Sequence, residues 1–239
     1  MTMKPEDFVD DLKTGLADKL KSVVLYGSAA TGDFLKGVSG YNLLVVAEPL
    51  GTSELQAVHT AAVKWEKAGN PLPQFFTPAE LAGSADAFPI EILDMQRSRK
   101  VLFGTDLLAS LKVDPAHLRM QLEHELKSKL LFFRQRYLVA CHTPERLTSL
   151  LASSVSTFLV LFRASLELYD EEVPSCKQEA LKKLAAYISF DSSPFESVLE
   201  LKSSRNLPAG IDLQTLAANY LAAIERIVQA VDQHLHPKS

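Results

Sequence analysis

The spacing of apolar residues changes near Lys112, and this change limits the folds that the 239-residue chain can adopt. Before that point, short β-branched runs alternate with stretches in which apolar residues recur every three or four positions. After it, only the helical spacing remains. Alternating strands and helices are typical of a layered α/β or α+β structure, whereas helices with one apolar face each must pack against one another. We therefore expect two domains, residues 1–112 and residues 113–239.

The first domain is expected to be an α+β domain in which helices cover a mixed sheet. Its candidate strands are short and apolar: Ser22–Tyr26, Tyr41–Ala47, Leu72–Phe76 and Ile90–Met95. Its candidate helices have helical spacing and recognisable start or stop signals: residues 5–20, residues 53–68, and a short helix beginning at Thr77–Glu80. The sheet would form the core of this domain.

The second domain is expected to be an all-α bundle. Asp114-Pro115 and Thr143-Pro144 each combine an N-cap residue with a proline at the first helical position. Further helices are expected at about 176–189, about 195–204 and from Asp212 onward. The apolar stretch Leu147–Leu168 is interrupted by polar and charged residues, so it falls short of the roughly 18 to 20 apolar residues of a membrane span.

Composition excludes several classes of protein. The net charge of −4 argues against coating of DNA or RNA, which needs clustered lysine and arginine. Two cysteines, Cys141 and Cys176, are too few for a disulfide framework or a cysteine-ligated metal. The charged N-terminal segment lacks the apolar centre of a signal peptide. We expect a cytoplasmic protein that contacts neither membrane nor nucleic acid.

The turn after the first strand is the strongest candidate for chemistry. Gly27-Ser28 follows a buried strand and precedes a short helix, and Gly32 comes five residues after Gly27. Backbone N–H groups at a helix start favour an anion, and a glycine lets a phosphate approach the backbone. Gly27, Ser28 and Gly32 are thus candidate phosphate-binding residues. A plain structural turn is the alternative.

The wider window resembles the DNA polymerase β-like nucleotidyltransferase superfamily. In that superfamily the turn Gly-Ser-x-Ala-Arg-Gly is followed by a linker and by Ser-Asp-x-Asp-Leu-Leu-Val. This chain has Gly-Ser-Ala-Ala-Thr-Gly from Gly27 and Ser-Gly-Tyr-Asn-Leu-Leu-Val from Ser39. With a helical bundle following, the layout is similar to that of the aminoglycoside nucleotidyltransferases, as a stand-alone bacterial member.

The resemblance implies a metal site that this chain has largely lost. In the superfamily, the two aspartates and a carboxylate from a later strand hold Mg²⁺ ions that activate an acceptor hydroxyl and stabilise the transferred phosphate. Here the aspartate positions are Gly40 and Asn42, and Glu91 falls at the third position. We expect Asp94 to point away from Glu91, because residues three apart on a strand face opposite sides. No confident metal ligand remains; Glu91 and Asn42 are the candidates.

Three functions stay open on the sequence. The first is a catalytically impaired nucleotidyltransferase homologue that binds a nucleotide, another phosphate ligand or a protein partner, a second copy of the chain included. The second is an active Mg²⁺-dependent enzyme that moves a nucleoside monophosphate from a nucleoside triphosphate to a small-molecule hydroxyl. The third is an interaction module that binds no nucleotide. Arg97, Arg99 and Lys100 could attract a triphosphate, although a solvated turn is the more usual meaning of such a cluster.

Overall fold

The chain forms two compact units, Met1–Asp114 and Pro115–Ser239. The computed structural model describes residues 3–31, 40–169, 172–204, 210 and 212–234. Within that part of the chain, all strands belong to the first unit, and the second unit is built from helices. The predicted fold class, an α+β unit with a mixed sheet followed by an all-α bundle, is confirmed.

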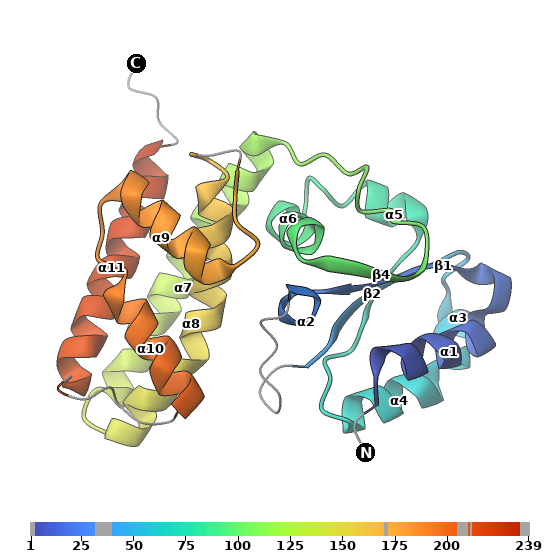
Figure 1. Ribbon diagram of the computed structural model, residues 1–239, viewed down its shortest axis with the longest axis horizontal. Helices are drawn as coiled ribbons and strands as arrows, with labels where there is room; N and C mark the ends of the chain where they lie inside the picture. Colours follow the sequence, from blue (N-terminus) through green and yellow to red (C-terminus); the bar gives the residue numbers. More distant parts are fainter. Residues whose placement is uncertain (1–2, 32–39, 170–171, 205–209, 211, 235–239) are drawn as a thin grey trace. The chain divides into compact units, whose positions relative to one another are not determined.

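A four-stranded mixed sheet forms the centre of the first unit (Figure 1). Its strands are β1 (Leu20–Tyr26), β2 (Asn42–Ala47), β3 (Gln74–Phe76) and β4 (Arg99–Gly104). Their order across the sheet is β3-β2-β1-β4. β1 is antiparallel to both of its neighbours, whereas β2 and β3 are parallel. The two central strands are buried on both faces, which explains their continuous apolar sequences.

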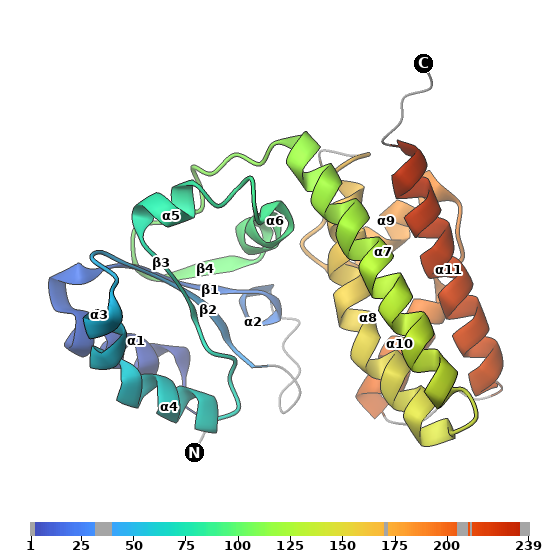
Figure 2. The ribbon, with the colours of Figure 1, turned by 180° about the vertical axis from the view of Figure 1, so that it is seen from behind.

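Helices cover both faces of this sheet (Figures 1 and 2). One face carries α1 (Pro5–Leu16), α3 (Thr52–Ala57) and α4 (His59–Lys67), and the other carries α5 (Pro78–Ala82) and α6 (Pro89–Arg97). The 3₁₀ helix η1 (Ala17–Lys19) and the four-residue α2 (Ser28–Thr31) flank β1. Phe8 and Trp65 fill the first layer, with their rings 4.7 Å apart. Leu81, Ile92 and Met95 fill the second layer.

Two sequence predictions for this unit need correction, and one strand was not predicted. Residues 90–95 form part of helix α6 rather than a strand, because Pro89 starts a helix whose residues Ile92 and Met95 face the sheet. The helix predicted over residues 53–68 is interrupted at Val58, so that α3 and α4 are separate. Strand β4 was missed, since its first residues are charged. The capping box of Thr77 and Glu80 is confirmed by reciprocal hydrogen bonds of 2.8 and 3.2 Å.

The second unit is the expected helical bundle. Its helices are α7 (Pro115–Ala140), α8 (Pro144–Leu166), α9 (Lys177–Ile188), α10 (Ser193–Ser204) and α11 (Leu213–His234). An aromatic cluster at its centre joins four of these helices, with ring centroids 4.7 to 6.4 Å apart: Phe133, Phe158, Phe162, Phe195 and Tyr220. The buried Tyr220 hydroxyl lies 3.0 Å from the Ser154 hydroxyl, so the cluster also satisfies its polar group.

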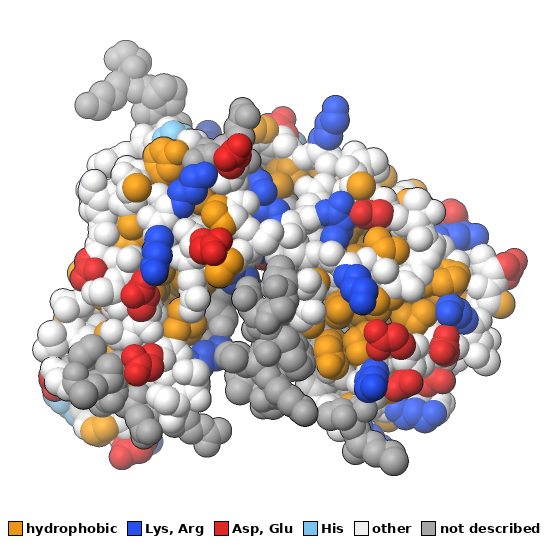
Figure 3. Space-filling view, in the orientation of Figure 1, with side chains coloured by type: hydrophobic (Ala, Val, Ile, Leu, Met, Phe, Trp, Pro, Cys, Tyr) orange, Lys and Arg blue, Asp and Glu red, His pale blue; other side chains and the backbone are white. Residues whose placement is uncertain are grey.

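Helix α8 is apolar because it is the core helix of this bundle. By length and composition it is the one helix in the described part of the chain that could cross a membrane. Its apolar face nevertheless packs inside the bundle, where Leu151, Val155 and Phe162 are fully buried. On the face drawn in Figure 3, lysine and arginine are interspersed with aspartate and glutamate. The described residues of that face therefore form no broad basic surface.

Candidate functional site

The glycine turn after β1 has a conformation that requires glycine. Gly27 has a φ of +78°, a region that side-chain-bearing residues rarely adopt. Its N–H donates to the Ser98 carbonyl at 2.8 Å, and its own carbonyl accepts from the Ala30 N–H at 2.9 Å. The Gly27 N–H is therefore hydrogen-bonded within the protein. Ser28 opens α2, and Gly32 lies outside the described residues.

The turn lies against the start of β2. A Cβ atom at Gly27 would come within 3.1 Å of Asn42 Nδ2. Asn42 is the first residue of β2 and pairs with Tyr26, the last residue of β1. The structure therefore brings together Gly27 and Asn42, two of the residues that the sequence selected.

Gly40, where the resemblance expects the first metal aspartate, is packed against another part of the chain. A Cβ atom at Gly40 would lie only 2.5 Å from Pro71 Cδ, and 3.3 Å from Asn70 Cα and from the Gly69 carbonyl oxygen. The neighbouring Tyr41 N–H donates to Asn70 Oδ1 at 3.1 Å, which fixes the turn in place. A side chain at Gly40 would require this turn to move.

Glu91 lies on helix α6. Glu91 was proposed as the third carboxylate because it was predicted to lie on a strand, and the structure removes this reason. Asp94 was expected on the opposite side from Glu91, and this expectation is wrong, because residues three apart on a helix share a face. The negative charges of Glu91 and Asp94 both act on the hydroxyl group of Tyr26. Burial, followed by the charges of Asp94 and Glu91, raises the pKa of Tyr26 to about 12.

This arrangement predicts the titration of Tyr26. Asp94→Asn should lower the pKa of Tyr26, because a nearby negative charge that disfavours the phenolate is removed. The pKa should nevertheless stay above the ordinary value of 10.0, since burial is the larger cause. NMR of ¹³C-labelled tyrosine would follow the titration, with Asp86→Asn on the exposed α5–α6 connection as control. An unchanged pKa in Asp94→Asn would contradict the placement of α6 over β1.

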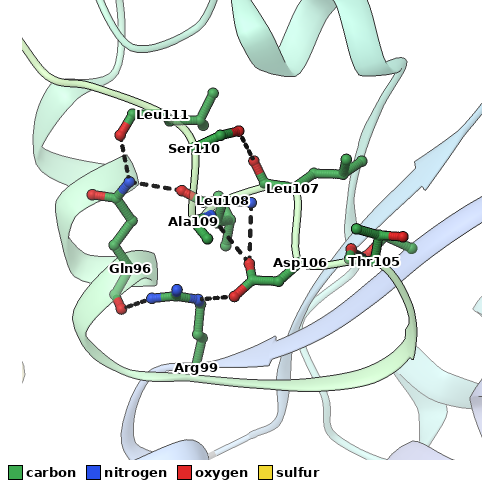
Figure 4. A network of polar contacts seen from close by, with 10 residues as sticks. Gln96, Arg99, Thr105, Asp106, Leu107, Leu108, Ala109, Ser110 and Leu111 are labelled. Carbon is green, nitrogen blue, oxygen red and sulfur yellow. Dashed lines mark hydrogen bonds and ion pairs between the residues drawn. The ribbon is translucent and has the colours of Figure 1, made fainter.

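Strand β4 brings positive charge to the same end of the sheet. Arg99 pairs with Tyr26, and Lys100 pairs with Leu25. The arginine is already engaged, since its Nε donates to Asp106 Oδ2 at 2.8 Å and its guanidinium also donates to the Gln96 carbonyl (Figure 4). The sequence interpretation of Arg99 and Lys100 as a solvated turn is therefore wrong.

Asp106 organises the segment that follows β4. Besides Arg99, it accepts hydrogen bonds from the N–H groups of Leu108 and Ala109, both at 3.2 Å (Figure 4). Gln96 of α6 binds the same segment through the carbonyls of Leu108 and Leu111, at 2.7 and 2.9 Å. The segment is thereby tied to α6 as well as to β4.

We expect Asp106→Ala to lower the free energy of unfolding by about 1–3 kcal/mol, because a partly buried arginine loses its charged partner and two N–H groups lose their acceptor. Urea denaturation would measure this loss. Asp86→Ala, on an exposed position of the same unit, is the matched control and should change stability by less than about 0.5 kcal/mol. Equal stability of the two variants would show that the network of Figure 4 contributes nothing.

The strand residues at this end of the sheet do not fit Mg²⁺. Directly paired residues of antiparallel strands point to the same face, so Asn42, Tyr26 and Arg99 form one row across β2, β1 and β4. The row offers an amide, a phenol and a guanidinium, whereas Mg²⁺ is bound through carboxylate oxygens. None of the four strands contains aspartate or glutamate. In the described ranges, no three histidine, cysteine, aspartate or glutamate side chains gather in a way that could hold a metal ion.

The fold and the glycine turn define a class of structure. An α+β unit with this turn after its first strand, followed by a helical unit, is the nucleotidyltransferase fold that the sequence pattern predicted. One solved structure with this fold is the spectinomycin adenyltransferase AAD(9) from Enterococcus faecialis, with ATP and spectinomycin. It is 16% identical, has a TM-score of 0.55, and the match covers 94% of this chain and 99% of that chain. No protein-family model and no curated protein matches the sequence.

Proposed function

We propose that this chain is a nucleotidyltransferase-fold protein that binds a nucleotide and does not catalyse metal-dependent transfer. The observation that carries the proposal is the packing of Pro71 against Gly40, because it fills the position at which an aspartate would hold the metal. The neutral amide of Asn42 at the second position points the same way. Both differences remove negative charge, which is what attracts Mg²⁺.

Nucleotide binding is supported by the parts of the site that remain. Gly27 keeps the left-handed backbone that allows close approach to a ligand, and it lies beside Asn42. The adenyltransferase of the same fold is seen with ATP. A soluble cytoplasmic protein is part of the proposal, supported by the interspersed surface charges of Figure 3 and by the burial of the apolar face of α8.

Calorimetric titration with ATP, GTP, CTP and UTP, each with and without Mg²⁺, tests this function. We expect at least one nucleotide to bind, with a dissociation constant that Mg²⁺ changes by no more than about twofold, since Gly40 and Asn42 offer no carboxylate to the metal. Binding that requires Mg²⁺, together with pyrophosphate release, would instead establish an active transferase. Absence of binding by all four nucleotides would favour an interaction module.

A negative charge added at Asn42 tests whether the nucleotide binds at the glycine turn. Asn42→Asp should weaken Mg²⁺-free nucleotide binding about threefold to tenfold, because the new carboxylate repels the phosphates at the glycine turn. Gln56→Glu adds the same charge at an exposed position of α3 and serves as the control. If both variants bind the nucleotide equally well, the ligand does not lie at this turn.

A further inference from the structure

A hollow opens between β3, α5 and α6, on the face of the sheet that these helices cover. Its volume is about 390 Å³. Four residues of the apolar core line it: Phe76, Leu81, Ile92 and Met95. The hollow exists because β3 has only three residues and α5 only five, so the helical layer does not close over the edge of the sheet.

The size and lining of the hollow suit a small organic molecule. Sites for such ligands have volumes of roughly 300 to 1,000 Å³ and mostly apolar walls with few polar groups. Phe88, which precedes α6, also lines the hollow and is 48% exposed. A ligand in the hollow would cover this ring.

The ionisable side chains that line the hollow are carboxylates. Glu91 belongs to its lining, and Glu80 lines an adjoining hollow of about 500 Å³ that shares Phe88 with the first. Hydrogen bonds from the N–H and hydroxyl groups of Thr77 lower the pKa of Glu80, which keeps it ionised. The described residues that line the two hollows include no lysine, arginine or histidine. Neither Gly27 nor Asn42 is among the residues that line the two hollows, so this hollow is distinct from the glycine turn.

We propose that this hollow binds a small organic cation with an apolar body, an ammonium group on an aromatic or aliphatic skeleton. The skeleton would pack on Ile92 and Met95, and burial of its apolar surface would supply most of the affinity. The ammonium group would lie near the Glu91 carboxylate and the face of the Phe88 ring, which attracts cations through its quadrupole.

Three probes that share a phenyl body test the proposal: 2-phenylethylammonium, 2-phenylethanol and phenylacetate. They carry a positive charge, no charge and a negative charge. Each would be titrated into the full chain with methyl-labelled isoleucine, leucine and methionine, so that the Ile92 and Met95 methyl groups report binding in the hollow. We expect the ammonium to bind about threefold to fivefold more tightly than the alcohol, the factor of a partly exposed ion pair, and phenylacetate to bind least.

Two exposed positions allow variants with little risk to folding. Glu91→Gln should reduce the affinity of the ammonium to that of the alcohol, and Phe88→Ala should weaken both probes. Matched controls on the opposite helical layer are Glu66→Gln and Leu55→Ala, which should leave all affinities unchanged. The proposal is overturned if the alcohol or phenylacetate binds as tightly as the ammonium, if Glu91→Gln has no effect on the ammonium, or if no probe shifts the Ile92 and Met95 methyl signals. These results do not depend on nucleotide binding.

Discussion

Gly40→Asp is expected to destabilise the first unit by about 2–4 kcal/mol and to create no Mg²⁺ site. The new Cβ atom would lie 2.5 Å from Pro71 Cδ, far inside van der Waals contact. The proline cannot withdraw easily, because its carbonyl accepts a hydrogen bond of 2.8 Å from the buried Trp65 indole. Urea denaturation would measure the loss, and Mg²⁺ titration would show whether any metal binds.

A second substitution separates the steric effect from a general loss of stability. Pro71→Ala removes the ring carbon that the new side chain would meet but keeps the carbonyl that Trp65 needs. In a double-mutant cycle, Gly40→Ala combined with Pro71→Ala should therefore cost less than the sum of the two single variants. Additive costs, or a Gly40→Asp variant as stable as the natural chain, would contradict the packing of the turn against Gly40.

Trp65→Ala is expected to lower stability by about 3–5 kcal/mol, since it removes the largest fully buried side chain of the chain's described part. The indole packs against Phe8 and holds Pro71. Trp65→Phe keeps most of the apolar volume but loses the hydrogen bond, and about 1–3 kcal/mol should be lost. Because this is the single tryptophan of the sequence, circular dichroism rather than fluorescence must follow unfolding.

The comparison of the two tryptophan variants tests a link between core and site. If Trp65→Phe is as stable as the natural chain, the indole does not fix the turn, and the position beside Gly40 is held by other contacts. A clear loss in Trp65→Phe would mean that the indole hydrogen bond to Pro71 helps to hold the turn that packs against Gly40. The exposed Leu55→Ala is the control and should change stability by less than about 0.5 kcal/mol.

Elements with a long and regular apolar pattern could be predicted from the sequence. In α7 and α8, apolar residues recur every three or four positions over the whole helix. β1 and β2 are continuous apolar runs, as buried strands are. The strand predicted over residues 90–95 was wrong because Ile-Glu-Ile alternates as a strand does. Pro89, which precedes this run, is the better signal, since it marks the start of a helix. β4 was not predicted because it is an edge strand. Its first residues, Arg99 and Lys100, carry charges that a buried strand would not have.

The candidate site was predictable only in its local part. The glycine turn and its neighbour Asn42 follow from residues close in sequence, and the structure brings them together. The packing of Pro71 against Gly40 joins residues about thirty positions apart, and no local pattern encodes it. Glu91 and Asp94 share a face on a helix but would face opposite sides on a strand. Because residues 90–95 were predicted as a strand, the relation between the two carboxylates was also predicted wrongly.

Binding of Mn²⁺, a paramagnetic substitute for Mg²⁺, tests the central claim most directly. Electron paramagnetic resonance would measure free Mn²⁺ with protein alone, with each nucleoside triphosphate alone, and with both together. We predict that the protein binds no Mn²⁺ by itself and that the mixture binds no more than the nucleotide alone, because Gly40 and Asn42, the positions at which the resemblance expects the metal aspartates, carry no carboxylate. Additional Mn²⁺ bound in the mixture, lost in Asn42→Ala, would show a working metal site and contradict the account.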